Sequence, residues 1–181
     1  MLKPPDRLTD GTVVLRKLRE GDRAAVIATM RDPLVRQWLN MPRDAGDREF
    51  DTVMRTVAGG FRTGERYDFA VATDDDEPSR GVVIASRRHR DNYEVAYLAG
   101  ERGRGNGLMT LAVRLLCGWL LDEGVGRIEV RTHPENLASQ RLAERAGFTR
   151  EGRERKSIWL HGERHDAVVW SLLPGDARPR L

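Results

Sequence analysis

Cysteine is nearly absent from this sequence of 181 residues, which contains only Cys117. A single thiol excludes an intrachain disulfide framework. The sequence also has no apolar run of the roughly 20 residues that a membrane span requires, and its N-terminus has no charged and then apolar leader. These absences predict a cytoplasmic protein without a membrane partner. The four histidines form no metal-ligand cluster, so we expect no metal site.

A strong excess of one charge is missing as well. The formal net charge is +3 at pH 7, and the sequence pI is about 9.4. So weak an excess does not by itself indicate nucleic acid as a partner. The basic cluster at residues 87–90 is typical of a solvated turn. The alternative, a nucleic-acid surface, predicts binding that falls steeply with added salt.

The composition is that of a globular protein, with 39% hydrophobic and 33% charged residues. We expect one domain over residues 1–173, followed by a flexible tail over 174–181. Spacings of apolar residues predict strands at 12–18, 67–73, 81–86, 93–98, 127–132, from 148 and at 166–173, and helices at 24–30, from 33, at 50–61, from 108 and before 147. Short polar turns predict an antiparallel meander over the central strands, followed by a parallel β-α-β unit.

The most informative stretch is the turn over residues 100–107, between a predicted strand and a long apolar helix. Its glycines allow the backbone to turn sharply and to approach a ligand closely. The first N–H groups of the helix and its dipole favour an anion there. A dinucleotide-binding turn would need a third glycine at Leu108, and a nucleotide-triphosphate loop would need a Gly-Lys pair, so both patterns fail. An ordinary glycine-rich turn with two solvated arginines is the alternative.

The pattern that remains, Arg102-x-x-Gly105-x-Gly107, resembles the coenzyme A pyrophosphate loop of the GNAT superfamily of N-acetyltransferases. A second match is Asn136-x-x-Ser139, which lies before a Gly-Phe pair. Together with the segment that runs from this pair to the last strand, it resembles the subgroup of ribosomal-protein N-terminal serine and alanine acetyltransferases. The resemblance covers nearly the whole chain. It implies an α/β (α+β) fold, with a mixed, mostly antiparallel twisted sheet of about seven strands, flanked by about four helices and splayed at the acyl-CoA site.

The resemblance also implies which residues contact acetyl-CoA. Pantetheine is expected to pair with the strand before the turn, the pyrophosphate to lie on the turn, and an asparagine side chain to hold the pantetheine arm. The implied cofactor-binding residues are Tyr97, Leu98, Ala99, Arg102, Gly103, Arg104, Gly105, Asn106, Gly107, Leu108 and Asn136.

Acyl transfer to an amine needs a base, oxyanion donors and a hydrogen bond or proton for the leaving thiolate. Glu94 is the candidate base, because it lies on the strand beside the expected acetyl site; a solvent-facing carboxylate is the alternative. In the subgroup a serine at the position of Ser139 serves the thiolate, where many relatives use a tyrosine a few residues later. Ala143 stands four residues beyond it here. Cys117 lies in an apolar helix and is a poor nucleophile, which favours direct transfer.

The acceptor is expected to be a primary amine. The subgroup resemblance points to a protein N-terminus, and a small molecule such as an aminoglycoside or a polyamine is the alternative. A protein of another class, a regulator that binds acyl-CoA without turnover, would keep the same motifs. A homodimer is left open.

Overall fold

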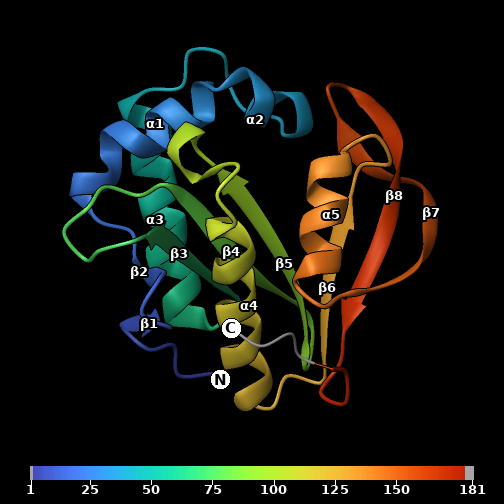
Figure 1. Ribbon diagram of the computed structural model, residues 1–181. Helices are drawn as coiled ribbons and strands as arrows, with labels where there is room; N and C mark the ends of the chain where they lie inside the picture. Colours follow the sequence, from blue (N-terminus) through green and yellow to red (C-terminus); the bar gives the residue numbers. More distant parts are fainter. Residues whose placement is uncertain (1, 178–181) are drawn as a thin grey trace.

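The computed structural model of the protein describes residues 2–177, and over this range one sheet of eight strands runs through the molecule (Figure 1). The strands are β1 (Arg7–Thr9), β2 (Val14–Lys17), β3 (Arg66–Ala72), β4 (Gly81–His89), β5 (Asn92–Ala99), β6 (Arg127–Thr132), β7 (Thr149–Leu160) and β8 (Glu163–Leu172). The helices are α1 (Arg23–Arg31), α2 (Pro33–Trp38), α3 (Asp47–Thr63), α4 (Leu108–Asp122) and α5 (Leu137–Arg145), with short 3-10 turns η1 (Glu20–Asp22) and η2 (Glu101–Gly103).

The strand order is β1-β2-β3-β4-β5-β6-β8-β7, and of the pairs in this sheet β5–β6 alone is parallel. The expected mixed, mostly antiparallel architecture is confirmed. Among the described residues one strand exceeds the expected number. The additional strand is β1, whose three residues are too few and too exposed to show an alternation of apolar and polar side chains.

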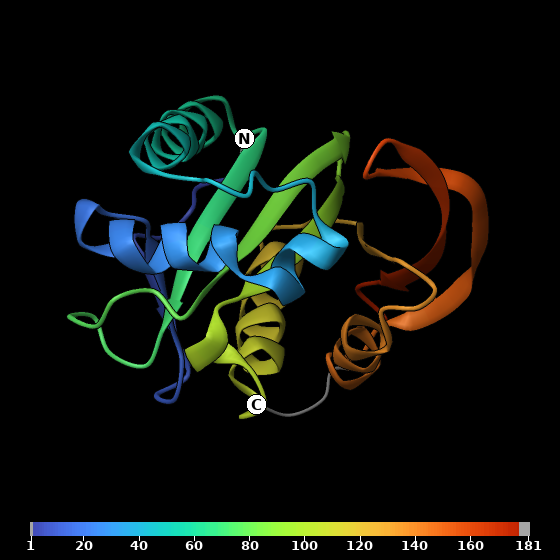
Figure 2. The ribbon, with the colours of Figure 1, turned by 90° about the horizontal axis from the view of Figure 1, so that it is seen from above.

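Helices cover both faces of the sheet (Figure 2). The helix α4 is apolar on most sides because it packs over the central strands in the larger core cluster, which also contains Phe148 and Trp170 from the far half. A second cluster joins α1 and α3 to the opposite face of β3 and β4. The two faces of β5 therefore serve different layers: the side chain of Tyr97 packs with the α4 cluster and that of Leu98 with the α1–α3 cluster.

The sheet splits between β5 and β6. These strands pair only where residues 92–94 face residues 127–129. Beyond that point β5 stays paired with β4 as far as Ala99, while β6 stays paired with β8 as far as Thr132. The facing edges of the two strands consequently diverge, and Figure 2 shows the gap widening between β5 and the β6–β8 half. The expected splay is present.

The two aspartates that precede α1 and α2 have different roles. Asp32 caps α2 by accepting a 2.8 Å hydrogen bond from the N–H of Leu34, with Pro33 at the first helical position. Asp22 stands at the N-cap position of α1, but its side chain makes no cap hydrogen bond to that helix. Its fully buried carboxylate instead accepts two hydrogen bonds from the guanidinium of Arg16, at 2.8 and 2.9 Å. Burying an ionised carboxylate without a partner cation costs more free energy than leaving a helix without a side-chain cap.

No helix within residues 2–177 has the length and apolarity to cross a bilayer. Of the tail expected over 174–181, the first four residues form a turn and lie outside any helix or strand, and the remainder lies outside the described residues.

Candidate functional site

The turn after β5 is shaped by contacts that glycine alone permits. Gly103 is buried, and a Cβ at that position would stand 2.4 Å from the carbonyl oxygen of Arg80. Gly105 and Gly107 have φ of +77° and +79°, and no atom lies within 4 Å of the place where their Cβ atoms would be. The first glycine therefore seats the turn against the β3–β4 connection, and the other two leave open space in front of α4.

Backbone donors point into this open space. Within the described residues, the N–H groups of Gly105, Gly107 and Met109 have no acceptor. The N–H of Leu108 donates to the side-chain oxygen of Asn106 at 3.1 Å. The amide nitrogen of Asn106 in turn contacts the carbonyl oxygen of Arg102 at 3.3 Å. Asn106 thus holds the turn closed through its side chain, and free N–H groups on both sides of Leu108 suit an anion.

The two arginines of the turn differ in their partners. Arg104 forms an ion pair with Asp32, the capping residue of α2. Burial acts to raise the pKa of Asp32, but the hydrogen bond from Arg104 and the N–H of Leu34 outweigh it, and the pKa is lowered. The side chain of Arg102 is 64% exposed and lies 3.9 Å from Glu77. Arg102 is therefore free to meet a ligand, whereas Arg104 ties the turn to α2.

A tyrosine from β5 reaches across the gap to the first turn of α5. The hydroxyl of Tyr97 lies 2.8 Å from the Oγ of Ser139 and 3.0 Å from its carbonyl oxygen. Asn136 caps α5 by accepting a 3.1 Å hydrogen bond from the N–H of Ser139. The amide nitrogen of Asn136 has no partner among residues 2–177 and is available to a ligand. The two motif residues are therefore brought together with the unpaired edge of β5.

Glu94 lies where the gap begins, in the last pair between β5 and β6. Its Oε2 accepts hydrogen bonds from Arg88 at 2.6 Å and from Arg131 at 3.0 Å. Arg131 also contacts Glu129 and Glu154. Within the described residues, the Oε1 of Glu94 accepts no hydrogen bond, so one lone-pair face of a held carboxylate is open. Ion pairs thus hold Glu94 at the start of the gap with its side chain 20% exposed, and its role as the base stays a prediction.

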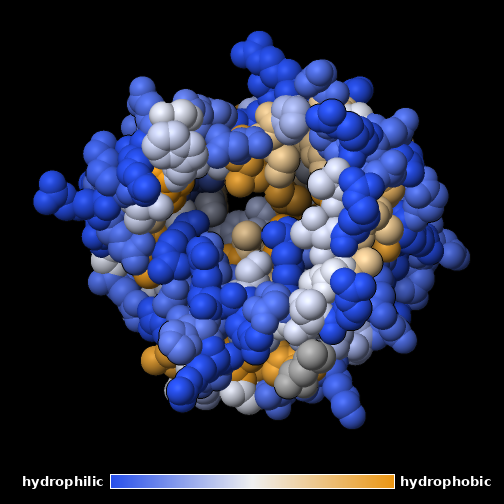
Figure 3. Space-filling view, turned by 180° about the vertical axis from the view of Figure 1, so that it is seen from behind, coloured by the Kyte–Doolittle hydropathy of each residue, from blue (hydrophilic) through white to orange (hydrophobic). Residues whose placement is uncertain are grey.

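The gap is bridged at its wide end. Asn40, which follows α2, donates to the carbonyl oxygen of Trp159 at 2.9 Å and accepts from the N–H of His161 at 2.8 Å. The rings of Trp38 and His133 lie 5.1 Å apart across the same junction. Figure 1 shows α2 meeting the β7–β8 hairpin above the gap. Figure 3 shows the resulting hollow from the opposite face, with hydrophobic residues inside a largely hydrophilic rim.

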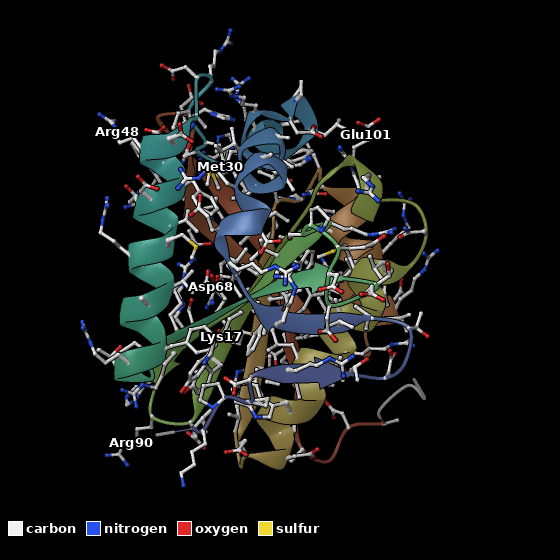
Figure 4. The ribbon with its side chains drawn as sticks, turned by 90° about the vertical axis from the view of Figure 1, so that its left-hand side faces the viewer. Lys17, Met30, Arg48, Asp68, Arg90 and Glu101 are labelled. Carbon is white, nitrogen blue, oxygen red and sulfur yellow. The ribbon has the colours of Figure 1, made fainter. Side chains whose placement is uncertain are left out.

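A cavity of about 80 Å³ lies between α1–α3 and the sheet. Its lining includes Leu98 from the free edge of β5, together with Met30 and Ile84. At its polar end Arg66 donates to both oxygens of Asp68, at 2.8 and 2.7 Å. Figure 4 shows Met30 and Asp68 in the layer between the helices and the sheet. The site thus has two sides: the glycine turn before α4 with its unpaired N–H groups, and an apolar cavity beneath α1–α3.

Two of the three arginines in the basic cluster at residues 87–90 are paired with carboxylates. Arg87 pairs with Glu65, and Arg88 pairs with Glu94. The thiol of Cys117 is buried, and burial raises its pKa.

Three contacts of the site gave no signal in the sequence: the contact of the Tyr97 hydroxyl with Ser139, the Asp32–Arg104 ion pair, and the hydrogen bonds of Asn40 to the β7–β8 hairpin. Each joins residues far apart in the chain.

Comparisons with known proteins agree with this geometry. The profile described as Acetyltransferase (GNAT) domain matches residues 12–149. YdaF of Bacillus subtilis (strain 168), provisionally named a ribosomal N-acetyltransferase, is 32% identical over 175 residues, which cover 90% of each chain. YjcK of the same organism, provisionally named an N-acetyltransferase, is 34% identical over 116 residues, and the match covers 62% of this chain and 64% of YjcK. This chain therefore spans less than two thirds of that relative.

The architecture also has close counterparts among solved structures. RimL, a ribosomal L7/L12 α-N-protein acetyltransferase solved in complex with coenzyme A, superposes with a TM-score of 0.81 at 19% identity. The superposition covers 93% of this chain and 98% of RimL. At this identity the likeness concerns the fold. The profile match over most of the chain and the YdaF relationship establish more than the fold: the chain belongs to the GNAT acetyltransferase family.

Proposed function

We propose that this protein transfers an acetyl group from acetyl-CoA directly to a primary amine. The observation that carries the proposal is the placement of Ser139 opposite the unpaired edge of β5, with an anion-binding turn at one side and an apolar cavity at the other. Membership of the GNAT family supports the same reaction.

The residues of the site suit coenzyme A. The free N–H groups of Gly105, Gly107 and Met109, together with exposed Arg102, offer donors for a pyrophosphate. The backbone of residues 97–99 lacks a partner on the β6 side, so an extended amide-containing arm can pair with it. The amide nitrogen of Asn136, which has no partner among residues 2–177, offers one more donor at the first turn of α5. When bound, acetyl-CoA supplies an activated thioester at the gap.

The side chains around the gap then have separate roles. Glu94 takes the proton of the incoming amine through a water molecule, using its open Oε1. A backbone N–H near Leu98 stabilises the developing oxyanion. The hydroxyl of Ser139 donates a hydrogen bond to the leaving thiolate. A free α-amino group, with a pKa of about 7.7–8.0, needs far less help from a base than a lysine does.

The acceptor we infer is the α-amine of a protein N-terminus. Support comes from YdaF and RimL, which are named for ribosomal-protein acetylation. A small amine remains the second candidate acceptor. A regulator that binds acyl-CoA without turnover is the alternative from another class.

The test is release of free thiol from acetyl-CoA with peptides that begin with Ser or Ala, with aminoglycosides and with polyamines. Acetyl-CoA binding is followed in parallel by calorimetry. We expect turnover with peptides, and a loss of roughly 100-fold in kcat for Ser139→Ala with little change in acetyl-CoA affinity. Turnover with small amines alone would change the acceptor, and tight binding without any turnover would favour the regulator. Absence of binding would refute the proposal.

A further inference from the structure

We propose that Tyr97 is a positioning residue for the reaction, and that its hydroxyl sets the direction in which Ser139 donates its proton. This inference rests on the proposed function of Ser139. It begins from one contact, in which the phenolic oxygen lies 2.8 Å from the Oγ of Ser139 and 3.0 Å from the carbonyl oxygen of the same residue.

The two distances limit how the hydroxyl hydrogens can be arranged. A phenol has one proton to donate, and a serine hydroxyl has one proton and two lone pairs. When Tyr97 donates to the Oγ of Ser139, the serine proton must point elsewhere, and the gap is open to it. When Tyr97 donates to the carbonyl oxygen instead, its own oxygen can accept the serine proton and withdraw it from the gap. The direction in which the Tyr97 hydroxyl donates therefore decides whether the hydroxyl of Ser139 can donate into the gap.

The surroundings keep Tyr97 in place and protonated. Its ring packs against the core cluster under α4, on the strand that ends at the glycine turn. Burial raises the pKa of Tyr97 to about 12, although its hydrogen bond with Ser139 acts in the opposite direction. The phenol is consequently protonated at neutral pH and has a proton to donate. One turn beyond Ser139 along α5 stands Ala143, so no other hydroxyl on that turn competes for the role.

In the reaction, the amine nitrogen attacks the thioester carbonyl carbon. A C–N bond forms, the C–S bond breaks, and its electron pair goes to sulfur. The amine proton leaves to Glu94 through water. Sulfur accepts a hydrogen bond from Ser139, whose oxygen accepts one from Tyr97. Tyr97 neither gains nor loses a proton, and its contribution is orientation.

The first experiment needs no acceptor. The pKa of the thiol of bound coenzyme A is measured by ultraviolet absorbance of the thiolate in the wild type and in Tyr97→Phe, Ser139→Ala and the double variant. Tyr93→Phe is the matched control, because its hydroxyl lies on the same strand but donates to the carbonyl oxygen of Gly64 at 3.3 Å. We expect a raised thiol pKa in Tyr97→Phe and Ser139→Ala, no further rise in the double variant, and no change in the control. An equal thiol pKa in the wild type and Tyr97→Phe would overturn the proposal.

The second experiment measures turnover of the same variants. We expect Tyr97→Phe to lower kcat about tenfold, the value of a single hydrogen bond, with KM for acetyl-CoA unchanged. In the Ser139→Ala background the same change should cost less than about twofold, because the partner is gone. Equal losses in both backgrounds would show that Tyr97 acts independently of Ser139, which contradicts the proposal. If no acceptor is acetylated although coenzyme A binds, the proposed function fails, and the thiol pKa still decides the role of Tyr97. A protein that does not bind coenzyme A would contradict both.

Discussion

Arg80 places its carbonyl oxygen 2.4 Å from the point where a Cβ on Gly103 would stand. The clashing atom belongs to the backbone, and Gly103 itself is buried in the turn, so neither can move aside easily. We therefore expect Gly103→Ala to destabilise the protein by about 1–3 kcal/mol. The same change should weaken acetyl-CoA binding, because it displaces the free N–H groups of the turn. Urea unfolding and calorimetry measure the two effects.

Gly118 is the matched comparison. It lies inside α4, and no atom comes within 4 Å of the place where its Cβ would stand. We expect Gly118→Ala to stabilise the protein by about 0.5–1 kcal/mol, since alanine is the better helix former, and to leave acetyl-CoA affinity unchanged. Destabilisation by both substitutions would contradict this steric account.

Glu94 carries a prediction of its own. If its open Oε1 removes the amine proton through water, Glu94→Gln should lower kcat/KM for a peptide by about 100-fold at pH 7. The loss should shrink above about pH 8, where the α-amine is already neutral. A pH profile of thiol release measures this. A loss that is constant from about pH 6 to pH 9 would instead indicate a structural role, through the bonds to Arg88 and Arg131.

At this scale the sequence predicted what is local. The glycine turn and the Asn136–Ser139 cap lie within single short segments, so the sequence marks them directly. The Tyr97–Ser139 contact joins residues 42 apart, and the Asp32–Arg104 pair joins residues 72 apart. Such contacts depend on how β5 and α5 face one another, and no periodicity in the chain encodes that distance.

Among the elements, β6, β7 and β8 are tied together by Glu151. It accepts hydrogen bonds from Arg127, at 2.9 Å, and from the hydroxyl of Ser171, at 2.7 Å. These bonds lower the pKa of Glu151 from 4.5 to about 2, with that of Arg127 the larger cause. A lowered pKa means that this contribution to stability is complete above about pH 4.5 and is lost as the pH falls toward 2.

Glu151→Gln tests this tie. A shift of one pKa unit corresponds to about 1.4 kcal/mol, but solvent screens a side chain that is 39% exposed. We therefore expect the variant to be less stable than the wild type by about 1 kcal/mol at pH 7, and the difference to vanish near pH 2. Urea unfolding at a series of pH values measures it. A difference that persists unchanged at low pH would exclude the ionic explanation.

Helices and strands with a strong periodicity of apolar residues were predicted well, and those with a weak periodicity were not. The amphipathic α3 and the apolar α4 carry long, regular patterns. The three-residue β1 carries none, and the β7–β8 hairpin is longer than expected because its outer residues are exposed and charged on both faces. Where water covers both sides of a strand, no alternation of burial marks it.

For the whole molecule, the prediction is direct transfer. Cys117 is only 2% exposed in the core, and burial raises the pKa of its thiol, so it does not carry the acetyl group. Initial rates with both substrates varied should give intersecting lines in double-reciprocal plots, and Cys117→Ala should keep kcat within about twofold. Parallel lines, or an acetylated enzyme seen by mass spectrometry, would contradict direct transfer.

The junction of Asn40 with the β7–β8 hairpin closes the gap between β5 and β6 into a ring of protein. A ring can be threaded but cannot be laid over a strand, so whatever passes through it must possess a free end. A chain terminus has one, and so do a small molecule and a long side chain, whereas the backbone in the middle of a polypeptide does not. If the proposed function holds, the connectivity of the fold, rather than any single side chain, limits the acceptor to groups that can be threaded into this ring.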